Sequence, residues 1–342
     1  MQSHNPMYNV LDYSSPTSIK QFLDANNCAM QKKWGQNFLI DPFMREKIID
    51  MLGDIEGKKV WEVGPGLGAM THLLGKKNIH ITLFEIDALF ISFLKHTFAN
   101  KLAPVPVTSQ ITSSAKGSSI KIIEGNVLKL WKNEVKENGM PDVFFGCLPY
   151  NISIELLLAL FKNRTIFDKM LITVQKEVAQ KMLAKENRKE YSALSVFTDY
   201  FYKSSNTCHI PPSCFWPQPK VTSTATVLIK KERNDLKDEN LFIHLVSSLF
   251  SSRRRTIKNN LTAMLKQPNF LQLVSNKEDI RQKNGWVQKF DIKDFNADSF
   301  FASLKIDSSS RAENLTTDDF VAIANSLKDY HQHHKLSRRG DL

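Results

Sequence analysis

Short apolar runs alternate with amphipathic stretches over the first two thirds of the chain. Lys59–Val63 is an apolar run that ends in glycines, and Ala69–Leu74 follows it with helical spacing. Ile79–Glu85 alternates apolar and polar residues as a half-buried strand does, and Leu89–Phe98 is again helical. Strand, glycine turn, helix and strand in this order predict one βαβ unit.

The alternation continues after residues 99–119, whose Pro, Ser, Thr and Gly content predicts a loop insertion. Val221–Ile229 alternates well enough to predict a late edge strand or hairpin. Repeated strand and helix units predict a mostly parallel sheet with helices on both faces. Three further strands are expected at Ile120–Glu124, Val143–Phe145 and Met170–Val174.

A charged segment, residues 231–240, interrupts the apolar pattern and predicts a domain boundary. Beyond it the spacing is helical at Leu241–Ser251, Arg254–Leu265, Ala297–Leu304 and Thr317–Leu327. The last twelve residues contain three histidines and three basic residues, and we expect disorder there rather than a metal site. The predicted organisation is a polar leader (1–30), an α/β domain (31–231), a helical domain (240–330) and a basic tail (331–342).

Composition narrows the class of protein. The 342 residues include 42% hydrophobic residues, which is enough for a core, yet no apolar stretch approaches the roughly 18–20 residues of a membrane helix. The first 30 residues lack the charge layout of a targeting segment, so we expect a cytoplasmic protein. Four cysteines without paired C-x-x-C spacing indicate reduced thiols and no structural metal.

The net charge of +11 suggests a polyanionic partner. Its distribution is more informative than its size. Residues 240–277 contain basic side chains and no acid, with Arg253, Arg254, Arg255 and Lys258 close together. Residues 201–231 contain Lys203, Lys220, Lys230 and Lys231, again without an acid. Each stretch alone is compatible with a solvated face, but both together favour nucleic acid.

The glycine turn between the first strand and helix indicates a nucleotide-like ligand. Gly64 and Gly66 leave the backbone accessible and permit positive φ, and the N–H groups of the following helix face the crevice at the strand ends. Glu85 ends the next strand, where a carboxylate can accept both hydroxyls of a ribose. Gly64, Gly66 and Ala69 also fit the dinucleotide pattern G-x-G-x-x-A, so a dehydrogenase is the competing interpretation.

Two residues argue against a dinucleotide. Glu62 precedes the first glycine, where it would repel a pyrophosphate but would suit a ligand with a free ammonium group. Pro65 stiffens the turn that would hold phosphate. S-adenosylmethionine is an adenosine with a sulfonium and an amino acid but no phosphate, and it is the cofactor that we expect.

Two loops combine aromatic rings with prolines. Tyr150 follows Pro149 after a predicted strand, and Phe215 stands in the segment FWPQPKV. Rings on two stiff loops can hold a base that has been drawn out of its stack, at about 1–3 kcal/mol per stacking contact. For either loop alone, an ordinary surface aromatic in a proline-rich turn is the alternative.

Nine blocks of sequence occur in a familiar order. They are KWGQNFLID, EVGPGLGAMT, FEID, GNVLKL, CLPYNIS, QKEVAQKM, YSALSV, FWPQPKVTS and RRRTIKNNL. From Gln31 to Leu327 the chain resembles the small-subunit rRNA adenine N6,N6-dimethyltransferases of the KsgA type. The related Erm methylases share the GQNFL and PKV blocks, but the C-terminal blocks resemble the housekeeping branch.

The resemblance implies a Rossmann-like α/β fold with a seven-stranded methyltransferase sheet and a small all-α C-terminal domain. It also implies roles for single residues. Asn37 and Leu39 would cover the cofactor, and Gly64 would approach its methionine part. Glu62, Gly66 and Cys147 would also belong to the cofactor site. Glu85 would bind the ribose and Asn126 the adenine. Tyr150 and Phe215 would stack on the target base, the loop from Cys147 through Leu148 to Tyr150 would hold its amine, and Lys220, Arg253, Arg254, Arg255 and Lys258 would contact rRNA.

The chain departs from the family pattern at two of these positions. The family has Asp at the position of Asn126, and an amide can still form a hydrogen bond there. The family has Asn at the position of Cys147, where the amide oxygen and the Leu148 carbonyl would accept the protons of the target amine. Cysteine is a weak acceptor. Loss of one aligned contact costs roughly 2–4 kcal/mol of transition-state stabilisation.

Cys147 therefore leaves three interpretations. The first is a working but slowed enzyme, in which the Leu148 carbonyl and water replace the missing contact. The second is a chain that binds rRNA and cofactor and acts mainly in ribosome assembly. The third, a cysteine nucleophile for methylation at a pyrimidine carbon, fits poorly with an adenine-type loop. Our prediction is the first: S-adenosylmethionine-dependent dimethylation of adenine N6 in small-subunit rRNA by a monomer that needs no metal.

Overall fold

The computed structural model of the protein describes residues 11–27, 37–102, 118–149, 151–267 and 295–337, the last seven by their backbone alone. The chain forms two compact units. The first comprises Met1–Ala179 and Lys203–Lys230, and the second comprises Gln180–Tyr202 and Lys231–Leu342. The change of unit after Lys230 lies where the charged segment begins. Residues 180–202, which the sequence analysis assigned to the α/β domain, belong to the second unit, where Phe197 packs edge-on against Phe242.

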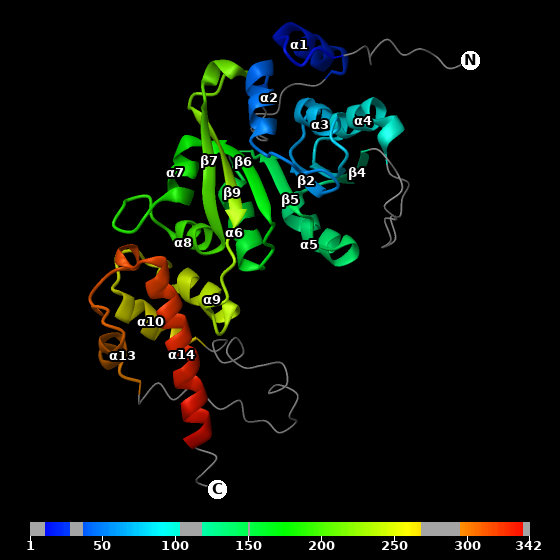
Figure 1. The fold of residues 1–342 in the computed structure, drawn as a ribbon. Coiled ribbons are helices and arrows are strands. Elements are labelled where there is room, and N and C mark those ends of the chain that lie inside the picture. The colour runs from blue at the N-terminus through cyan, green and yellow to red at the C-terminus, as the bar shows by residue number, and fades with distance from the viewer. Residues whose placement is uncertain (1–10, 28–36, 103–117, 150, 268–294, 338–342) are drawn as a thin grey trace. The chain divides into compact units, whose positions relative to one another are not determined.

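The first unit contains a seven-stranded sheet in the order β4-β3-β2-β5-β6-β9-β7. The five strands from β4 to β6 are parallel, and β9 is antiparallel to β6 (Figure 1). The predicted Rossmann-like class is thus confirmed. The strands are β2 (Lys59–Val63), β3 (His80–Glu85), β4 (Ser119–Glu124), β5 (Val143–Cys147), β6 (Lys169–Gln175), β7 (Tyr202–Ile210) and β9 (Ser223–Lys230).

The end of the sheet differs from the sequence prediction. The expected late strand, β9, lies inside the sheet between β6 and β7, and its first six residues are buried. The edge strand is β7, which the apolar pattern did not indicate. Five successive residues of β7, from Lys203 to Thr207, are exposed. A strand with so little buried surface has no hydrophobic period to detect.

Helices flank this sheet, and a short two-stranded pairing joins β1 (Phe38–Leu39) to β8 (Phe215–Trp216). Val60, Ile81, Phe145 and Leu171 from four neighbouring parallel strands are buried in the main core. The helices that begin in this unit are α1 (Pro16–Ala25), α2 (Pro42–Asp50), α3 (Ala69–Leu74), α4 (Ala88–Thr97), α5 (Val127–Asn138), α6 (Ser153–Lys162) and α7 (Lys176–Leu183), with short 3-10 turns at Ala99–Lys101 and Pro212–Cys214.

The expected polar leader contains a helix. Ser15 caps α1 by accepting a hydrogen bond from the Ser18 amide, and Pro16 occupies its first turn. Ile19, Phe22 and Leu23 recur at helical spacing and are buried. The leader is therefore part of the folded first unit from residue 11 onward, which the sequence analysis did not predict.

The described elements of the second unit are helices. Two of them differ from expectation in length. The helix α10 begins at Ile257 with Thr256 as its cap, so Arg254 and Arg255 precede it. The last helix continues to Ser337, into the region that we expected to be disordered. The helices are α8 (Ala193–Phe201), α9 (Glu239–Leu249), α10 (Ile257–Leu265), α13 (Ala297–Ser303) and α14 (Thr317–Ser337), with a 3-10 turn at Ala312–Asn314.

Candidate functional site

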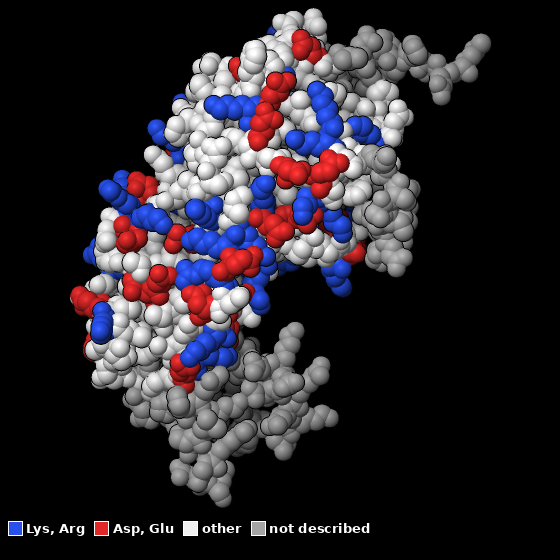
Figure 2. Space-filling model, in the orientation of Figure 1, with Lys and Arg blue, Asp and Glu red and all other residues white. Residues whose placement is uncertain are grey.

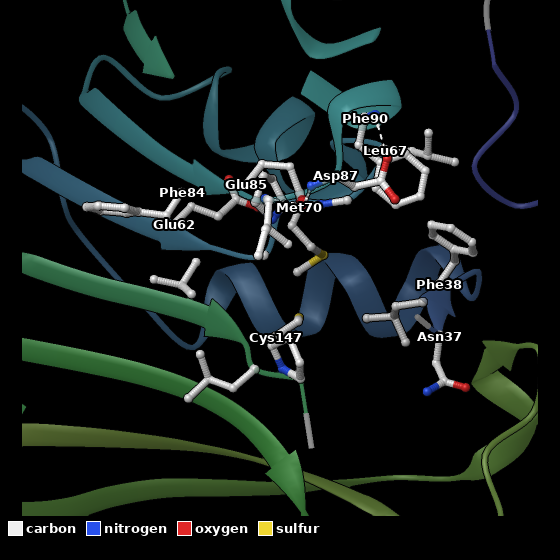
Figure 3. Close-up of a pocket in the computed structure, with 18 of the residues that line it drawn as sticks. Asn37, Phe38, Glu62, Leu67, Met70, Phe84, Glu85, Asp87, Phe90 and Cys147 are labelled. Carbon is white, nitrogen blue, oxygen red and sulfur yellow. Dashed lines mark hydrogen bonds between the residues drawn. The ribbon is translucent and has the colours of Figure 1, made fainter. Parts of the chain in front are cut away.

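A cavity lies at the carboxyl ends of the parallel strands, where open α/β sheets bind their ligands. Figure 3 shows Glu62, Glu85 and Asp87 along one side of it, Cys147 facing Met70, and Phe38 and Asn37 farther along. The structure thus brings together residues that are far apart in the chain. Of the predicted cofactor and catalytic residues, the lining includes Asn37, Leu39, Glu62, Gly64, Gly66, Glu85, Asn126, Cys147, Leu148 and Phe215, while Tyr150 lies outside the described residues.

The glycine turn has the backbone conformation that its sequence predicted. Gly64, Gly66 and Gly68 have φ values of 72°, 57° and 83°. A Cβ atom on Gly64 would lie 3.6 Å from the carbonyl oxygen of Cys147, so the turn closely approaches the end of β5. A side chain here would take space from a ligand that lies along the backbone.

Glu62 is buried at the end of β2, with 2% of its surface exposed. Its Oε2 accepts a hydrogen bond of 2.8 Å from the Thr71 hydroxyl. Burial raises the pKa of Glu62 to about 8, the Thr71 bond lowers it, and the neighbouring charge of Glu85 raises it further. A buried acid with a single hydroxyl donor is stabilised by a cation, so Glu62 is suited to an ammonium group.

Glu85 is also buried, but its carboxylate accepts three backbone hydrogen bonds. Oε1 accepts from the amides of Ile86 (2.8 Å) and Asp87 (2.9 Å), and Oε2 accepts from Gly66 (3.0 Å). Burial raises the pKa of Glu85, while these three bonds lower it. A carboxylate has about four lone-pair sites, so the site left for a ligand hydroxyl is on Oε2.

Asn126 caps the helix α5 on the adjoining side of the cavity. Its Oδ1 accepts a hydrogen bond of 2.9 Å from the Leu128 amide. An amide at this position caps a helix as well as a carboxylate does. Its Nδ2 group adds a hydrogen-bond donor that a carboxylate at this position would not have.

Cys147 is the last residue of β5 and is half-buried on the cavity wall. Burial, followed by the charge of Glu62, raises the pKa of its thiol to about 12. The thiol is therefore neutral at physiological pH, and a neutral thiol is a poor nucleophile. This argues against a covalent mechanism at Cys147. The next amide, that of Leu148, donates to the Thr173 carbonyl (3.0 Å), which anchors the peptide that follows the strand.

The pairing of β1 with β8 brings two predicted groups together. Leu39, expected over the cofactor, lies opposite Phe215, expected at the target base. Phe215 lines the cavity and is 7% exposed. Phe38 stacks with Trp216 at a ring centroid distance of 6.4 Å and an interplanar angle of 19°. The residue predicted to cover the cofactor and the residue predicted to stack on the base thus lie in one two-stranded element.

Several residues of the cavity were not predicted from the sequence. Asp87 follows Glu85 and caps α4, and its position after a strand end would have been a usable signal. Tyr13 and Ile19 come from the leader, which the sequence predicted only as a polar segment. A search for a capped helix with apolar residues at i, i+3 and i+4 would have indicated Ile19, but Tyr13 precedes the helix and carries no such signal.

The basic residues predicted to contact rRNA have different surroundings. Lys220 is exposed in the first unit, and Arg254 and Arg255 are exposed in the second. Arg253 is bound to Glu313 through Nη2 (2.8 Å) and to the Lys189 carbonyl (2.9 Å), and Lys258 pairs with Asp298. Arg253 and Lys258 thus take part in contacts within the second unit.

Two kinds of structure are not found in the described ranges. They contain no group of three or more His, Cys, Asp or Glu side chains placed to hold a metal ion. No helix in these ranges is long and apolar enough to cross a lipid bilayer.

Comparison with known proteins gives one consistent family. The family described as "Ribosomal RNA adenine dimethylase" matches residues 27–298. "Ribosomal RNA small subunit methyltransferase A" of Treponema denticola is 40% identical over 317 residues, which are 92% of this chain and 96% of that protein. The protein of the same name from Borreliella burgdorferi is 35% identical over 94% of this chain and 97% of its own length.

Solved structures support the fold. A dimethyladenosine transferase from Plasmodium falciparum has a TM-score of 0.60 and 23% identity, and the match covers 83% of this chain and 94% of that one. The 23S rRNA methyltransferase ErmE has a TM-score of 0.53 and 16% identity over 84% and 98%. Both cover most of the chain, which agrees with the α/β class derived from the sequence.

Proposed function

The chain belongs to the ribosomal RNA adenine dimethylase family, and on this premise we propose that it transfers methyl groups from S-adenosylmethionine to N6 of adenines in small-subunit rRNA, twice per base. The observation that supports this most directly is the cavity itself. Its walls combine two buried carboxylates, a glycine turn and the strand-end loop that begins at Cys147. The family assignment and the chemistry of the cavity thus support the same activity.

The residues of the cavity fit the cofactor. Glu62 would meet the ammonium group of its methionine part, Glu85 the ribose through Oε2, and Asn126 the adenine. Asn37 and Leu39 would cover it, and Gly64 and Gly66 leave room for it beside the backbone. When bound, S-adenosylmethionine supplies a methyl group made electrophilic by the adjacent sulfonium.

The protein's own part in the reaction is alignment. The exocyclic amine of adenine is a weak nucleophile because its lone pair is delocalised into the ring. The carbonyl of Leu148 would accept a hydrogen bond from the amine and so orient its lone pair, while Phe215 and Tyr150 would hold the base by stacking. Cys147 contributes only a neutral thiol, so we infer a slower enzyme than one with the family Asn. Each transfer leaves the amine nitrogen positively charged, and one of its protons then leaves to water.

The substrate would be the RNA of a maturing small ribosomal subunit. We place the reaction in the cytoplasm because that substrate and the cofactor meet there, and we infer a monomer. The exposed residues Lys220, Arg254 and Arg255 would contact phosphates, while Arg253 and Lys258 would do so alongside their internal ion pairs.

The direct test is to incubate the protein with methyl-labelled cofactor and undermethylated small subunits. We expect label in N6,N6-dimethyladenine, and we expect Glu85→Ala to abolish it while small-subunit binding persists. Subunit binding without any methylated adenine from the unchanged protein would contradict the enzymatic proposal. It would support the assembly-factor interpretation of Cys147 instead.

A further inference from the structure

The N-terminal leader forms part of the wall of the cavity. Leu11, Ile19, Phe22 and Leu23 are buried in a small apolar cluster that is separate from the main core. The cluster also contains Leu67 from the glycine turn and Phe90 and Phe93 from α4, and Phe22 meets Phe93 edge-on at 4.8 Å. The leader is thus packed on the two elements that form one side of the cofactor cavity.

Tyr13 brings a polar ring from this leader into the cavity lining. Its ring lies 6.4 Å from that of His72 on α3. The residue before His72, Thr71, donates the hydrogen bond that holds Glu62. Tyr13 therefore lies in the part of the cavity wall that contains the carboxylate expected to bind the ammonium group.

The Tyr13 hydroxyl keeps its proton at physiological pH and can donate a hydrogen bond. Burial raises its pKa to about 12, Arg45 lowers it, and the charge of Glu62 raises it further. The influence of Glu62 agrees with the neighbourhood described by the ring contacts. A protonated phenol can donate to a carboxylate, and its ring offers apolar surface to methylene groups.

Arg45 joins the leader to the segment that would cover the cofactor. It lies in α2 and is 8% exposed. Its Nη1 donates to the carbonyls of Tyr13 (2.9 Å) and Leu39 (3.0 Å), and its Nη2 donates to the Ser14 hydroxyl (2.8 Å). A guanidinium has a rigid fork of donors, so one side chain fixes two chain segments in a single geometry.

We propose that Tyr13 contacts the amino-acid end of the bound cofactor and that Arg45 is the positioning residue that holds Tyr13 and Leu39 around it. The inference rests on the proposed function, because it takes S-adenosylmethionine as the ligand. It adds a residue from the leader to the binding site and a buried arginine that maintains its shape. Glu62 and Tyr13 would then recognise the two charged groups of the same amino acid, the ammonium and the carboxylate.

Two ligands distinguish a contact between Tyr13 and the amino-acid end of the cofactor from a general change in the shape of the site. S-adenosylhomocysteine carries the amino-acid end, and 5′-methylthioadenosine keeps the adenosine and sulfur but lacks that end. We would measure the dissociation constants of both by titration calorimetry. For Tyr13→Ala we expect the dissociation constant of S-adenosylhomocysteine to rise about tenfold, equivalent to one or two polar contacts. The value for 5′-methylthioadenosine should stay within about twofold.

Arg45 is tested with the same pair of ligands. Arg45→Met should weaken S-adenosylhomocysteine more than 5′-methylthioadenosine, and Arg45→Lys should recover part of the difference because an ammonium group retains donors for the same carbonyls. Arg188→Met replaces an exposed arginine outside the cavity and is the matched control. A partly unfolded preparation lowers the binding stoichiometry but does not change the ratio of the two constants, so that ratio reports on the site itself.

The outcomes distinguish the two proposals. If the unchanged protein binds neither adenosine ligand, the proposed function fails. If the unchanged protein binds both and Tyr13→Ala weakens both equally, or neither, the contact with the amino-acid end is overturned. If Arg45→Met leaves the ratio of the two dissociation constants unchanged, Arg45 has no positioning role.

Discussion

Two buried carboxylates face the same cavity but are held in different ways. Glu62 has one hydroxyl donor, whereas Glu85 has three backbone N–H donors. Backbone donors stabilise a carboxylate, so Glu85 is the better prepared of the two to remain ionised without a ligand. Glu62 favours protonation until a cation arrives. The sequence identified both residues, but only the folded structure shows this division of roles.

The raised pKa of Glu62 predicts a pH-dependent cost in stability. Between about pH 4.5, where the unfolded residue ionises, and about pH 8, the folded state holds a proton that the unfolded state has released. The contribution of Glu62 to stability therefore falls as the pH rises through this window. Glu62→Gln removes the ionisation, and its Oε1 can still accept from Thr71.

We expect Glu62→Gln to be close to the unchanged protein at pH 5 and more stable by roughly 2–4 kcal/mol at pH 8.5. Urea unfolding at both pH values measures this difference. The comparison at pH 5, where both side chains are neutral in the folded state, is the internal control. A variant that is less stable by the same amount at both pH values would show that Glu62 is not protonated in the free protein.

We expect the substitution Cys147→Asn to increase the activity of the protein. Cys147→Asn introduces an amide oxygen at the end of β5, beside the anchored Leu148 peptide, where the sequence resemblance implies an Asn. One aligned hydrogen bond is worth roughly 10²–10³-fold in turnover, so kcat should rise by about 100-fold with little change in cofactor affinity. Cys147→Ser, with a small hydroxyl, should gain less. Unchanged turnover in Cys147→Asn would show that this position does not limit the reaction.

At the scale of elements, the glycine turn is limited by space as well as by conformation. A Cβ on Gly64 would meet the Cys147 carbonyl at an ordinary distance of 3.6 Å. A Cβ on Gly68 would lie 2.8 Å from Leu94 and 3.0 Å from Phe98, both on or next to α4. A positive φ disfavours any side chain at both positions, but at Gly68 the neighbouring side chains also leave too little space for a Cβ.

Gly68→Ala should therefore destabilise the fold more than Gly64→Ala. The left-handed backbone alone costs roughly 1–2 kcal/mol, and overpacking adds roughly 1–3 kcal/mol at Gly68. Urea denaturation of the two variants would measure both losses. Gly64→Ala should instead show its main effect as weaker binding of S-adenosylhomocysteine. Equal losses of stability would show that Leu94 and Phe98 can shift to accommodate the added Cβ without destabilising the fold.

Elements with a periodic apolar pattern were predicted well, and the others were not. The strand β2 and the helix α3 have the bounds expected from sequence. The strand β7 was missed because its exposed polar residues are stabilised by pairing with β9, which is a long-range contact. The leader helix was missed because three buried residues among polar ones are a weak signal until the surface they cover is known.

At the scale of the whole molecule, the net charge of +11 is spread among residues of both signs. Figure 2 shows Lys and Arg side chains interleaved with Asp and Glu over the face it displays. Within the second unit, Arg253 and Lys258 are paired with acids. Exposed arginines that precede α10, Arg254 and Arg255, are better placed to exchange water for phosphate.

We expect Arg254→Gln together with Arg255→Gln to weaken binding to naked small-subunit rRNA and to reduce the salt dependence of binding by about one unit of slope per lost phosphate contact, about two in all. Arg188→Gln, at an exposed arginine outside both acid-free stretches, is the control. Filter binding over a range of salt concentrations provides the slopes. An unchanged slope in the double variant would remove these two residues from the RNA interface.

The sequence by itself determined the α/β class, most of the parallel strands, the glycine turn and the residue types of the cavity, because these depend on local periodicity and on motifs that are contiguous in the chain. Tertiary structure alone decided that the leader reaches the cavity through Tyr13, that Arg45 joins it to Leu39, and that Glu62 and Glu85 have different donors. These contacts join segments that are distant in sequence or depend on burial. No local pattern encodes them, since their stability arises only when the packed surfaces meet.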